Sequence, residues 1–284
     1  MRLSWSRIGA TAILALFVGA GAGCTLVNKI RAKNELNETA RAFREGHFEE
    51  AEQHAKRALY LDPSNKTAAV FIARVIHQQY KPGVESPENI AKAREAIAAY
   101  QKILETDRSN DEAYKAISVL YAAIKDETKL RDWILQRAND SSMSPEKRAE
   151  AYAILSGKDW DCSFRITESP EVKVTSKEGG TPKVVYNKPK DPKDFDNAQK
   201  CVTRGLEEAE TAIKFDSNNE SAWSYKTNLL LEAAKLAEMD GKADQKTAYQ
   251  KQAEVAGKRA ATLAEARRKK EEAADAAAAA SATP

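Results

Sequence analysis

The chain has 284 residues, of which 31% are charged and 7% are aromatic, with only 12 glycines and 9 prolines. The formal net charge at pH 7 is +3. This near-balance gives no reason to expect a nucleic-acid-binding protein, and the scarcity of glycine and proline favours a helical body.

The first 24 residues read as an export or anchoring segment. Arg2 and Arg7 precede an apolar run over residues 8–18, and a stretch of small residues then leads to Cys24. A positive start, an apolar run and a small-residue exit describe an export signal. The arrangement resembles bacterial lipoprotein signals, which implies lipidation of Cys24, although Gly21 stands where that family has a larger aliphatic residue.

Two alternatives to the lipoprotein signal stay open. Residues 8–27 are nearly long enough for an uncleaved membrane helix, which needs roughly 20 residues. The third possibility is a secretory signal that is simply removed. All three place the rest of the chain outside the cytoplasm, facing the periplasm of a bacterial cell envelope. A lipid anchor would need several acyl chains, because a single chain holds weakly.

Residues 32–65, AKNELNETARAFREGHFEEAEQHAKRALYLDPSN, form the most regular part of the body. Gly46 marks a turn between two helices, and Pro63 closes the unit. Small residues recur where the two helices must touch, at Ala40, Ala51, Ala55 and Ala58. This pattern resembles a tetratricopeptide repeat (TPR). Such a unit cannot bury its apolar face alone, so it implies neighbouring repeats.

The next two units follow the first in phase. Residues 66–80 predict a helix, residues 81–89 interrupt the pattern with two prolines and a glycine, and Ser86 with Pro87 predicts a new helix start. Asp107 and Asn110 then occupy the same relative places as Asp62 and Asn65 in the first repeat. A third helix pair is predicted over 111–138, followed by a helix from 145 to about 155.

The pattern breaks at Gly157, and residues 160–195 are interpreted as an insertion. Val172 and Val174 alternate with charged residues, and a Gly179–Gly180 turn precedes an apolar run over 184–186, so a β-hairpin is expected near 163–195. Helices are predicted again over 196–214, 221–236 and 243–267. The last of these is the expected cap, and residues 264–284 are expected to form a flexible tail rich in alanine, lysine and glutamate.

The fold predicted from these elements is all-α. Residues 25–263 are expected to form an α-α superhelical solenoid of TPR-like helix pairs, with the small β-hairpin inserted within residues 160–195.

The two cysteines of the body, Cys162 and Cys201, flank the insertion. In an oxidising compartment, two cysteines at the two ends of an irregular excursion indicate a disulfide. Closing a loop of roughly 40 residues contributes about 4 kcal/mol by the chain-entropy estimate. Two unpaired buried thiols, or a redox or metal pair, are the alternatives. Against a redox or metal pair, the chain has no Cys-x-x-Cys and no histidine near either cysteine.

No catalytic, cofactor-binding or metal-binding residues are predicted. The histidines, His47, His54 and His77, do not have the spacing of a zinc site. The sequence contains no Gly-x-Ser-x-Gly elbow, no phosphate-binding loop and no glycine-rich dinucleotide turn. We therefore expect no cofactor, no nucleic acid and no small-molecule substrate, and a protein that is not an enzyme.

The resemblance to tetratricopeptide repeats implies a concave groove that is lined by the first helix of each pair and takes a protein or peptide partner. In phase with the first repeat, the candidate groove residues are Phe43, Arg44, Val70, Arg74, His77 and Lys115.

The sequence thus favours a membrane-tethered scaffold that mediates protein–protein interactions in the cell envelope. A structural or stress-related envelope protein without a stable partner is the first alternative. An enzyme with its site in the insertion, residues 160–195, is the second.

Overall fold

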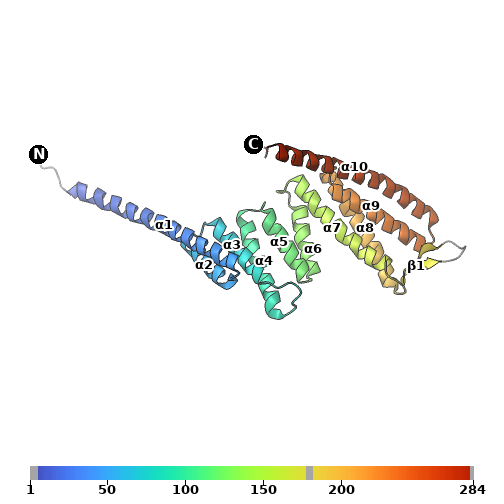
Figure 1. Cartoon of the computed structure of the whole chain (residues 1–284), viewed down its shortest axis with the longest axis horizontal. Coiled ribbons are helices and arrows are strands. Elements are labelled where there is room, and N and C mark those ends of the chain that lie inside the picture. The colour runs from blue at the N-terminus through green and yellow to red at the C-terminus, as the bar shows by residue number, and fades with distance from the viewer. Residues whose placement is uncertain (1–5, 177–181, 282–284) are drawn as a thin grey trace. The chain divides into compact units, whose positions relative to one another are not determined.

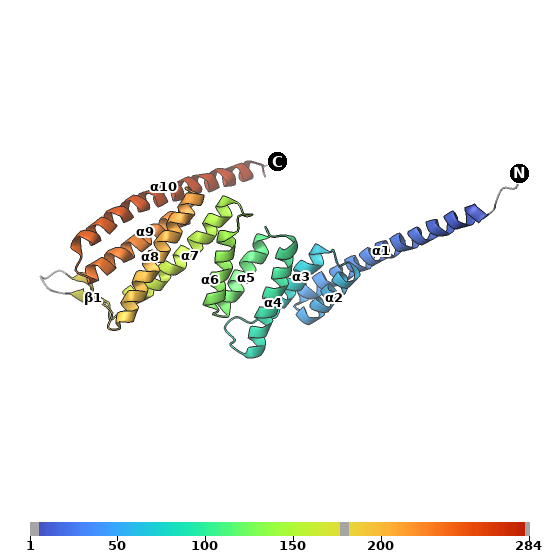
Figure 2. The same cartoon turned by 180° about the vertical axis from the view of Figure 1, so that it is seen from behind.

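The computed structural model describes the backbone of residues 6–176 and 182–281 and the side chains of residues 25–176 and 182–278. Within these ranges the chain forms ten helices, arranged as successive pairs, and one two-stranded hairpin (Figure 1 and Figure 2). The predicted all-α class with TPR-like pairs and a small hairpin insertion is therefore confirmed. The chain divides into two compact units, residues 1–130 and 131–284. Cys24 lies outside the residues whose side chains are described.

In unit 1, each of the first four helices packs against the next one along the chain. The helices are α1 (Ser6–Glu45), α2 (Phe48–Leu61), α3 (Lys66–Gln79), α4 (Pro87–Thr106) and α5 (Asp111–Ala123), and α6 (Glu127–Asn139) begins at the end of this unit. The predicted long turn between α3 and α4 is present. It is held by the side chain of Asn89, which accepts from the Lys81 N–H at 2.8 Å and donates to the Val84 carbonyl at 2.7 Å.

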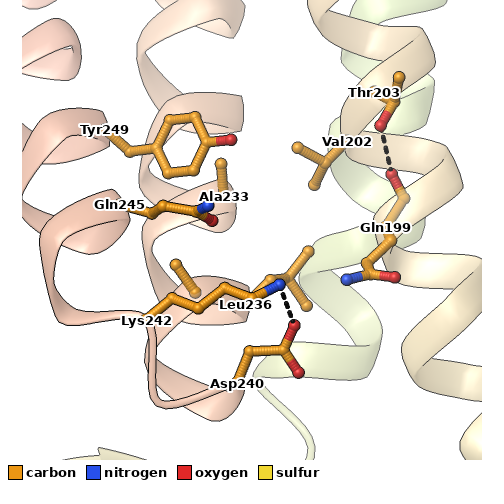
Figure 3. Close-up of a pocket in the computed structure, with 10 residues that line it drawn as sticks. Gln199, Val202, Thr203, Ala233, Leu236, Asp240, Lys242, Gln245 and Tyr249 are labelled. Carbon is orange, nitrogen blue, oxygen red and sulfur yellow. Dashed lines mark hydrogen bonds and ion pairs between the residues drawn. The ribbon is translucent and has the colours of Figure 1, made fainter.

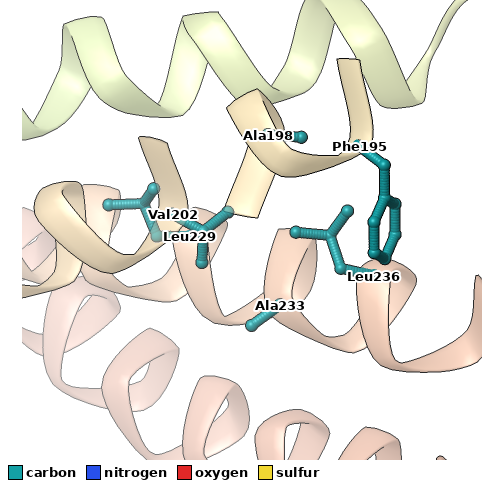
Figure 4. Close-up of a cluster of buried hydrophobic side chains, with 6 residues drawn as sticks. All are labelled: Phe195, Ala198, Val202, Leu229, Ala233 and Leu236. Carbon is teal, nitrogen blue, oxygen red and sulfur yellow. The ribbon is translucent and has the colours of Figure 1, made fainter. Parts of the chain in front are cut away.

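In unit 2, four long helices lie side by side in both views (Figure 1 and Figure 2). They are α7 (Pro145–Thr167), α8 (Pro192–Phe215), α9 (Glu220–Met239) and α10 (Ala243–Ser281), with β1 (Lys173–Ser176) and β2 (Lys183–Tyr186) between α7 and α8. Figure 4 shows part of the core, where side chains of α8 and α9 interdigitate. The buried residues of this cluster are Phe195, Ala198, Val202, Leu229, Ala233 and Leu236.

Three connectors between successive helix pairs have similar sequences. They are LDPSN between α2 and α3, TDRSN between α4 and α5, and FDSNN between α8 and α9. In the first copy, the side-chain oxygen of Asn65 accepts from the Ala68 N–H at 3.1 Å and so caps α3. Asn110 and Asn219 cap α5 and α9 in the same way, at 3.0 and 2.9 Å. An asparagine at this position satisfies one of the free N–H groups at a helix start. The parallel noted in the sequence is therefore a repeated structural element.

Three of the turns from a first to a second helix also share one geometry. Gly46, Lys125 and Gly241 have φ angles of 79°, 57° and 70°. The following N–H groups bond to carbonyls of the preceding helix, His47 to Ala42 at 2.9 Å and Lys242 to Ala237 at 2.8 Å. This is the Schellman type of helix ending, in which a left-handed residue reverses the chain. Glycine adopts that conformation without steric cost.

The predicted helix break at Gly157 is wrong. Helix α7 continues through Gly157 to Thr167, and α8 begins at Pro192 instead of at residue 196. A Cβ atom at Gly157 would lie 2.6 Å from the ring of Tyr225, so the glycine makes room for α9 and does not end the helix. The insertion therefore shrinks to the segment between Thr167 and Pro192.

The predicted β-hairpin is present within that shorter segment. Strands β1 and β2 are antiparallel, with Val174 opposite Val185. An isolated two-stranded hairpin is marginally stable in water, so contacts with the helices matter. Glu168, at the end of α7, provides them: its carboxylate accepts from Lys235 of α9 at 2.7 Å and from the Tyr186 hydroxyl at 3.2 Å. The predicted Gly179–Gly180 turn lies outside the described residues.

The last helix is longer than predicted. Instead of ending near residue 267, α10 continues to Ser281, so the segment expected to be a tail is helical over most of its length. Its high alanine content accounts for this, because alanine has the highest intrinsic helix propensity. Arg267 forms an ion pair with Glu220 of α9 at 2.9 Å.

A membrane span was one of the expectations for the N-terminus. In the part of the chain that the structure describes, no helix combines the length and the apolar character needed to cross a bilayer.

The close packing of α8 can be tested by an alanine substitution at Gly205 of α8, with a substitution at a second glycine as the control. At Gly205, a Cβ atom would lie 2.9 Å from both methyl groups of Leu229 and 3.0 Å from the Cβ of Asp159. Gly205→Ala is expected to lower the free energy of unfolding by about 1–2 kcal/mol, because overpacking outweighs the gain in helix propensity. Urea unfolding followed by circular dichroism measures this change.

Gly257→Ala in α10 is the matched control. Its Cβ would lie 3.4 Å from the nearest atom, a methyl group of Thr227, which is an ordinary contact. The free energy of unfolding is expected to stay unchanged or to rise by up to about 1 kcal/mol. Equal effects of the two substitutions would contradict the close approach of α8 to α7 and α9.

Candidate functional site

Four of the predicted groove residues lie on the first helices of the second and third pairs. Val70, Arg74 and His77 are spaced by four and three residues along α3, so they share one face of that helix. Lys115 lies on α5 and is exposed.

An ion pair joins these two helices. The Nε and Nη2 atoms of Arg74 donate to the two carboxylate oxygens of Glu112, each at 2.7 Å. This bidentate contact holds the pKa of Glu112 below its ordinary value. Both side chains are about half exposed, at 46% and 55%, so the ion pair contributes little to the stability of the fold. Its main effect is to hold the two side chains in a fixed orientation. Arg74 is thereby paired with Glu112, whereas Lys115 on α5 is exposed to solvent.

The pair also reveals two residues that the sequence reading missed. Glu112 and Val119 flank Lys115 at spacings of three and four on α5, so all three share a face of the helix. Val119 is 59% exposed, so it presents an apolar side chain at the surface beside Lys115. The helical spacing from Lys115 was the signal that would have found both. We call Val70, Arg74, Glu112, Lys115 and Val119 the α3–α5 face.

Two of the predicted groove residues point inward instead. Phe43 packs edge-to-face on Phe48, with ring centroids 5.6 Å apart, beside the buried Ala42 and Val75. His77 is half-buried, and its Nδ1 lies 3.3 Å from the hydroxyl of the buried Tyr100 of α4. Burial lowers the pKa of His77, so its ring is neutral at pH 7. Arg44, at the end of α1, is exposed.

The predicted disulfide is present, but its setting differs from the expectation. Cys162 and Cys201 are bonded, with Cα atoms 6.1 Å apart. Both lie well inside helices, in α7 and α8, and not at the ends of the hairpin. The bond therefore joins two helices that already pack together.

A buried charged cluster lies near the disulfide. Asp159 of α7 and Glu208 of α8 are 2% and 7% exposed. Arg204 donates to Asp159 through its Nε at 2.7 Å, and Arg131 forms ion pairs with both carboxylates. Burial, and then the charge of Asp159, raises the pKa of Glu208. Paired carboxylates of this kind occur in acid–base catalysis, but catalysis also requires access for a substrate.

A pocket is present elsewhere in unit 2, between α8 and α10 (Figure 3). Its volume is about 230 Å³, and Val202, Ala233 and Leu236 line it together with polar side chains. Neither Asp159 nor Glu208 nor Cys162 contributes to its lining. The pocket thus offers a small binding site of mixed polar and apolar lining that is separate from the buried charged cluster.

Comparison with known proteins gives a likeness of fold only. No family model and no curated protein matches the sequence. Among solved structures, the chain is similar to a double mutant of MamA RS-1, at 14% identity and a TM-score of 0.41, with 84% of this chain and 96% of that chain covered. It is also similar to PilF of Pseudomonas aeruginosa, at 14% identity and a TM-score of 0.36, with 78% and 90% covered.

A third similar structure is YrrB, described as a TPR protein with an unusual peptide-binding site. It has 11% identity and a TM-score of 0.34, with 76% of this chain and 90% of that chain covered. Because all three TM-scores lie below 0.5, these likenesses carry no argument about what this chain binds.

The contribution of the disulfide to stability can be measured directly. The cysteines are 39 residues apart, so replacing both in Cys162→Ala/Cys201→Ala removes a constraint on the unfolded chain. The free energy of unfolding is expected to fall by about 2–4 kcal/mol. Urea unfolding of the wild type should show the same loss when a reductant is added, while the double variant should not respond to reductant. Equal stability of the wild type with and without reductant would contradict a structural role.

Proposed function

We propose that this chain is a TPR-type scaffold that binds a segment of another protein on the α3–α5 face, and that it is not an enzyme. The observation that carries the proposal is the Arg74–Glu112 ion pair. It aligns the exposed sides of two first helices, which are the helices that present ligand-binding side chains in repeats of this kind.

The chemistry of this face indicates the kind of segment it accepts. Arg74 and Glu112 neutralise each other, which leaves Lys115 as the exposed charge, one helical turn from the exposed apolar side chain of Val119, while the half-buried Val70 lies one turn from Arg74 on α3. A partner helix or extended peptide with one carboxylate next to apolar side chains complements this pattern.

We further propose that the scaffold is tethered in the bacterial cell envelope and faces the periplasm. The disulfide supports a compartment outside the cytoplasm, because reducing conditions inside the cell keep most thiols free. The sequence that ends at Cys24 supports a lipid anchor. Leu26, Val27 and Ile30 of α1 are 47–62% exposed, so apolar surface continues directly after Cys24.

The partner site is tested by cross-linking from within the α3–α5 face. A photoreactive amino acid is placed at Val119 in the full chain, and its adducts are compared in the native membrane fraction. Lys115→Glu is expected to reduce the main adduct about fivefold, which corresponds to the loss of one surface ion pair. Lys102→Glu, an equal charge change at an exposed position of α4, is the control and should leave the adduct unchanged.

The role of the ion pair is tested with a charge swap. Arg74→Glu alone places two carboxylates together and is expected to weaken the adduct, whereas Arg74→Glu/Glu112→Arg restores the pair and the adduct. An adduct that is the same in Lys115→Glu, Lys102→Glu and Arg74→Glu would overturn the proposed site.

The anchor is tested by the intact mass of the mature protein isolated from membranes. The expected mass is that of a chain beginning at Cys24 and carrying a diacylglyceryl group with a further acyl chain. An intact Met1 would instead indicate an uncleaved membrane helix. An unmodified chain that begins after residue 18 would indicate a secreted protein and contradict the tether.

A further inference from the structure

The pocket of unit 2 exists because α8 and α10 stand apart on either side of α9. In Figure 3, Val202 and Gln199 lie on the wall formed by α8, and Tyr249 and Gln245 lie on the facing wall formed by α10. The floor is formed by α9, through Leu236 and two small residues, Ala233 and Ala237. The bottom of the pocket is therefore apolar.

The size of the pocket narrows the kind of ligand. Its volume is about 230 Å³. A cavity of about 150 Å³ lined by apolar side chains holds benzene, whereas sites for drug-sized molecules span about 300–1,000 Å³. The pocket therefore matches a single large apolar side chain better than a metabolite.

The charges at the rim of the pocket are uneven. Asp240 and Lys242 line the pocket, and Lys188, which does not line it, reaches the rim through its ion pair with Asp240. The Asp240 carboxylate accepts from Lys188 at 2.6 Å and from Lys242 at 2.9 Å. These two ammonium groups keep the pKa of Asp240 below its ordinary value, so it is ionised at pH 7. Both lysines are 53% exposed, while Asp240 is 16% exposed. Two exposed cations therefore share one carboxylate, and the rim attracts a further anion.

The walls add hydrogen-bonding groups that suit a peptide. The amide side chains of Gln199 and Gln245 border the pocket from opposite walls. An amide both donates and accepts, which matches the N–H and C=O groups of a polypeptide backbone.

We propose that this pocket is a second protein-binding site, which takes a large apolar side chain of a partner segment whose neighbouring carboxylate pairs with Lys188 and Lys242. The positive charge at the rim and the volume of the pocket together select this ligand. The site lies wholly within unit 2 and does not depend on the α3–α5 face.

The test uses a minimal probe with both features, N-acetyl-aspartyl-phenylalaninamide. Saturation-transfer NMR is recorded with the full chain in detergent micelles, and the signal from micelles alone is subtracted. Transfer to the phenyl protons is expected. N-acetyl-aspartyl-alaninamide should bind at least about tenfold more weakly, because the buried ring is missing. N-acetyl-lysyl-phenylalaninamide should bind about fivefold more weakly, because its charge is reversed.

Variants assign the signal to the pocket. Ala237→Leu fills the floor and is expected to abolish transfer to the phenyl protons, and Ala233→Leu serves the same purpose if the first variant unfolds. The matched control is Ala261→Leu, at an exposed position of α10, which should keep the full signal. Lys242→Glu is expected to weaken binding about fivefold, and Lys251→Glu, at an exposed position of α10, should not.

Three results would overturn the proposal. The first is equal transfer to the phenylalanine and alanine probes. The second is full transfer in a folded Ala237→Leu or Ala233→Leu variant. The third is concentration-dependent dimerisation in sedimentation velocity that Ala237→Leu abolishes, because it would assign the pocket to a second copy of this chain.

Discussion

Small side chains at helix crossings let neighbouring helices approach closely, and the packing of both units depends on that approach. Ala51, Ala58, Ala209 and Ala212 are completely buried, and Gly205 lies where a methyl group would touch Leu229. Each alanine removes little apolar surface from water, at about 25 cal/mol per Å². A core of this kind is stable only when many such contacts add up along paired helices, which is why repeats support one another.

Because the alanine contacts are alike, further contacts are needed to specify which helices pair in unit 2. The Cys162–Cys201 bond and the ion pair of the buried Asp159 with Arg204 both join α7 to α8. Buried Glu232 of α9 accepts from the hydroxyl of Thr167 of α7 at 2.6 Å. A buried charge is costly unless it is paired, so these contacts penalise any alternative packing that separates their members.

The same small residues shape the surfaces available for binding. Ala233 and Ala237 pack closely in the core, yet they also leave the space between α8 and α10 that forms the pocket (Figure 3). On the α3–α5 face, by contrast, specificity depends on which charges remain unpaired. The pairing of Arg74 with Glu112 thus decides that Lys115 carries the free positive charge.

The sequence by itself determined the helix pairs, their connectors and their turns, because capping asparagines, left-handed glycines and alanine spacing act within a few residues of each other. It also indicated the disulfide, because the two cysteines flank the expected insertion in a chain that is expected outside the cytoplasm. Only the tertiary structure decided that α7 continues through Gly157, that Phe43 and His77 point inward, and that Arg74 is bound to Glu112. Those outcomes depend on Tyr225, Phe48, Tyr100 and Glu112, residues that lie on other helices. Which of them meets a given side chain is fixed by how the helices pack, and a local pattern does not contain that information.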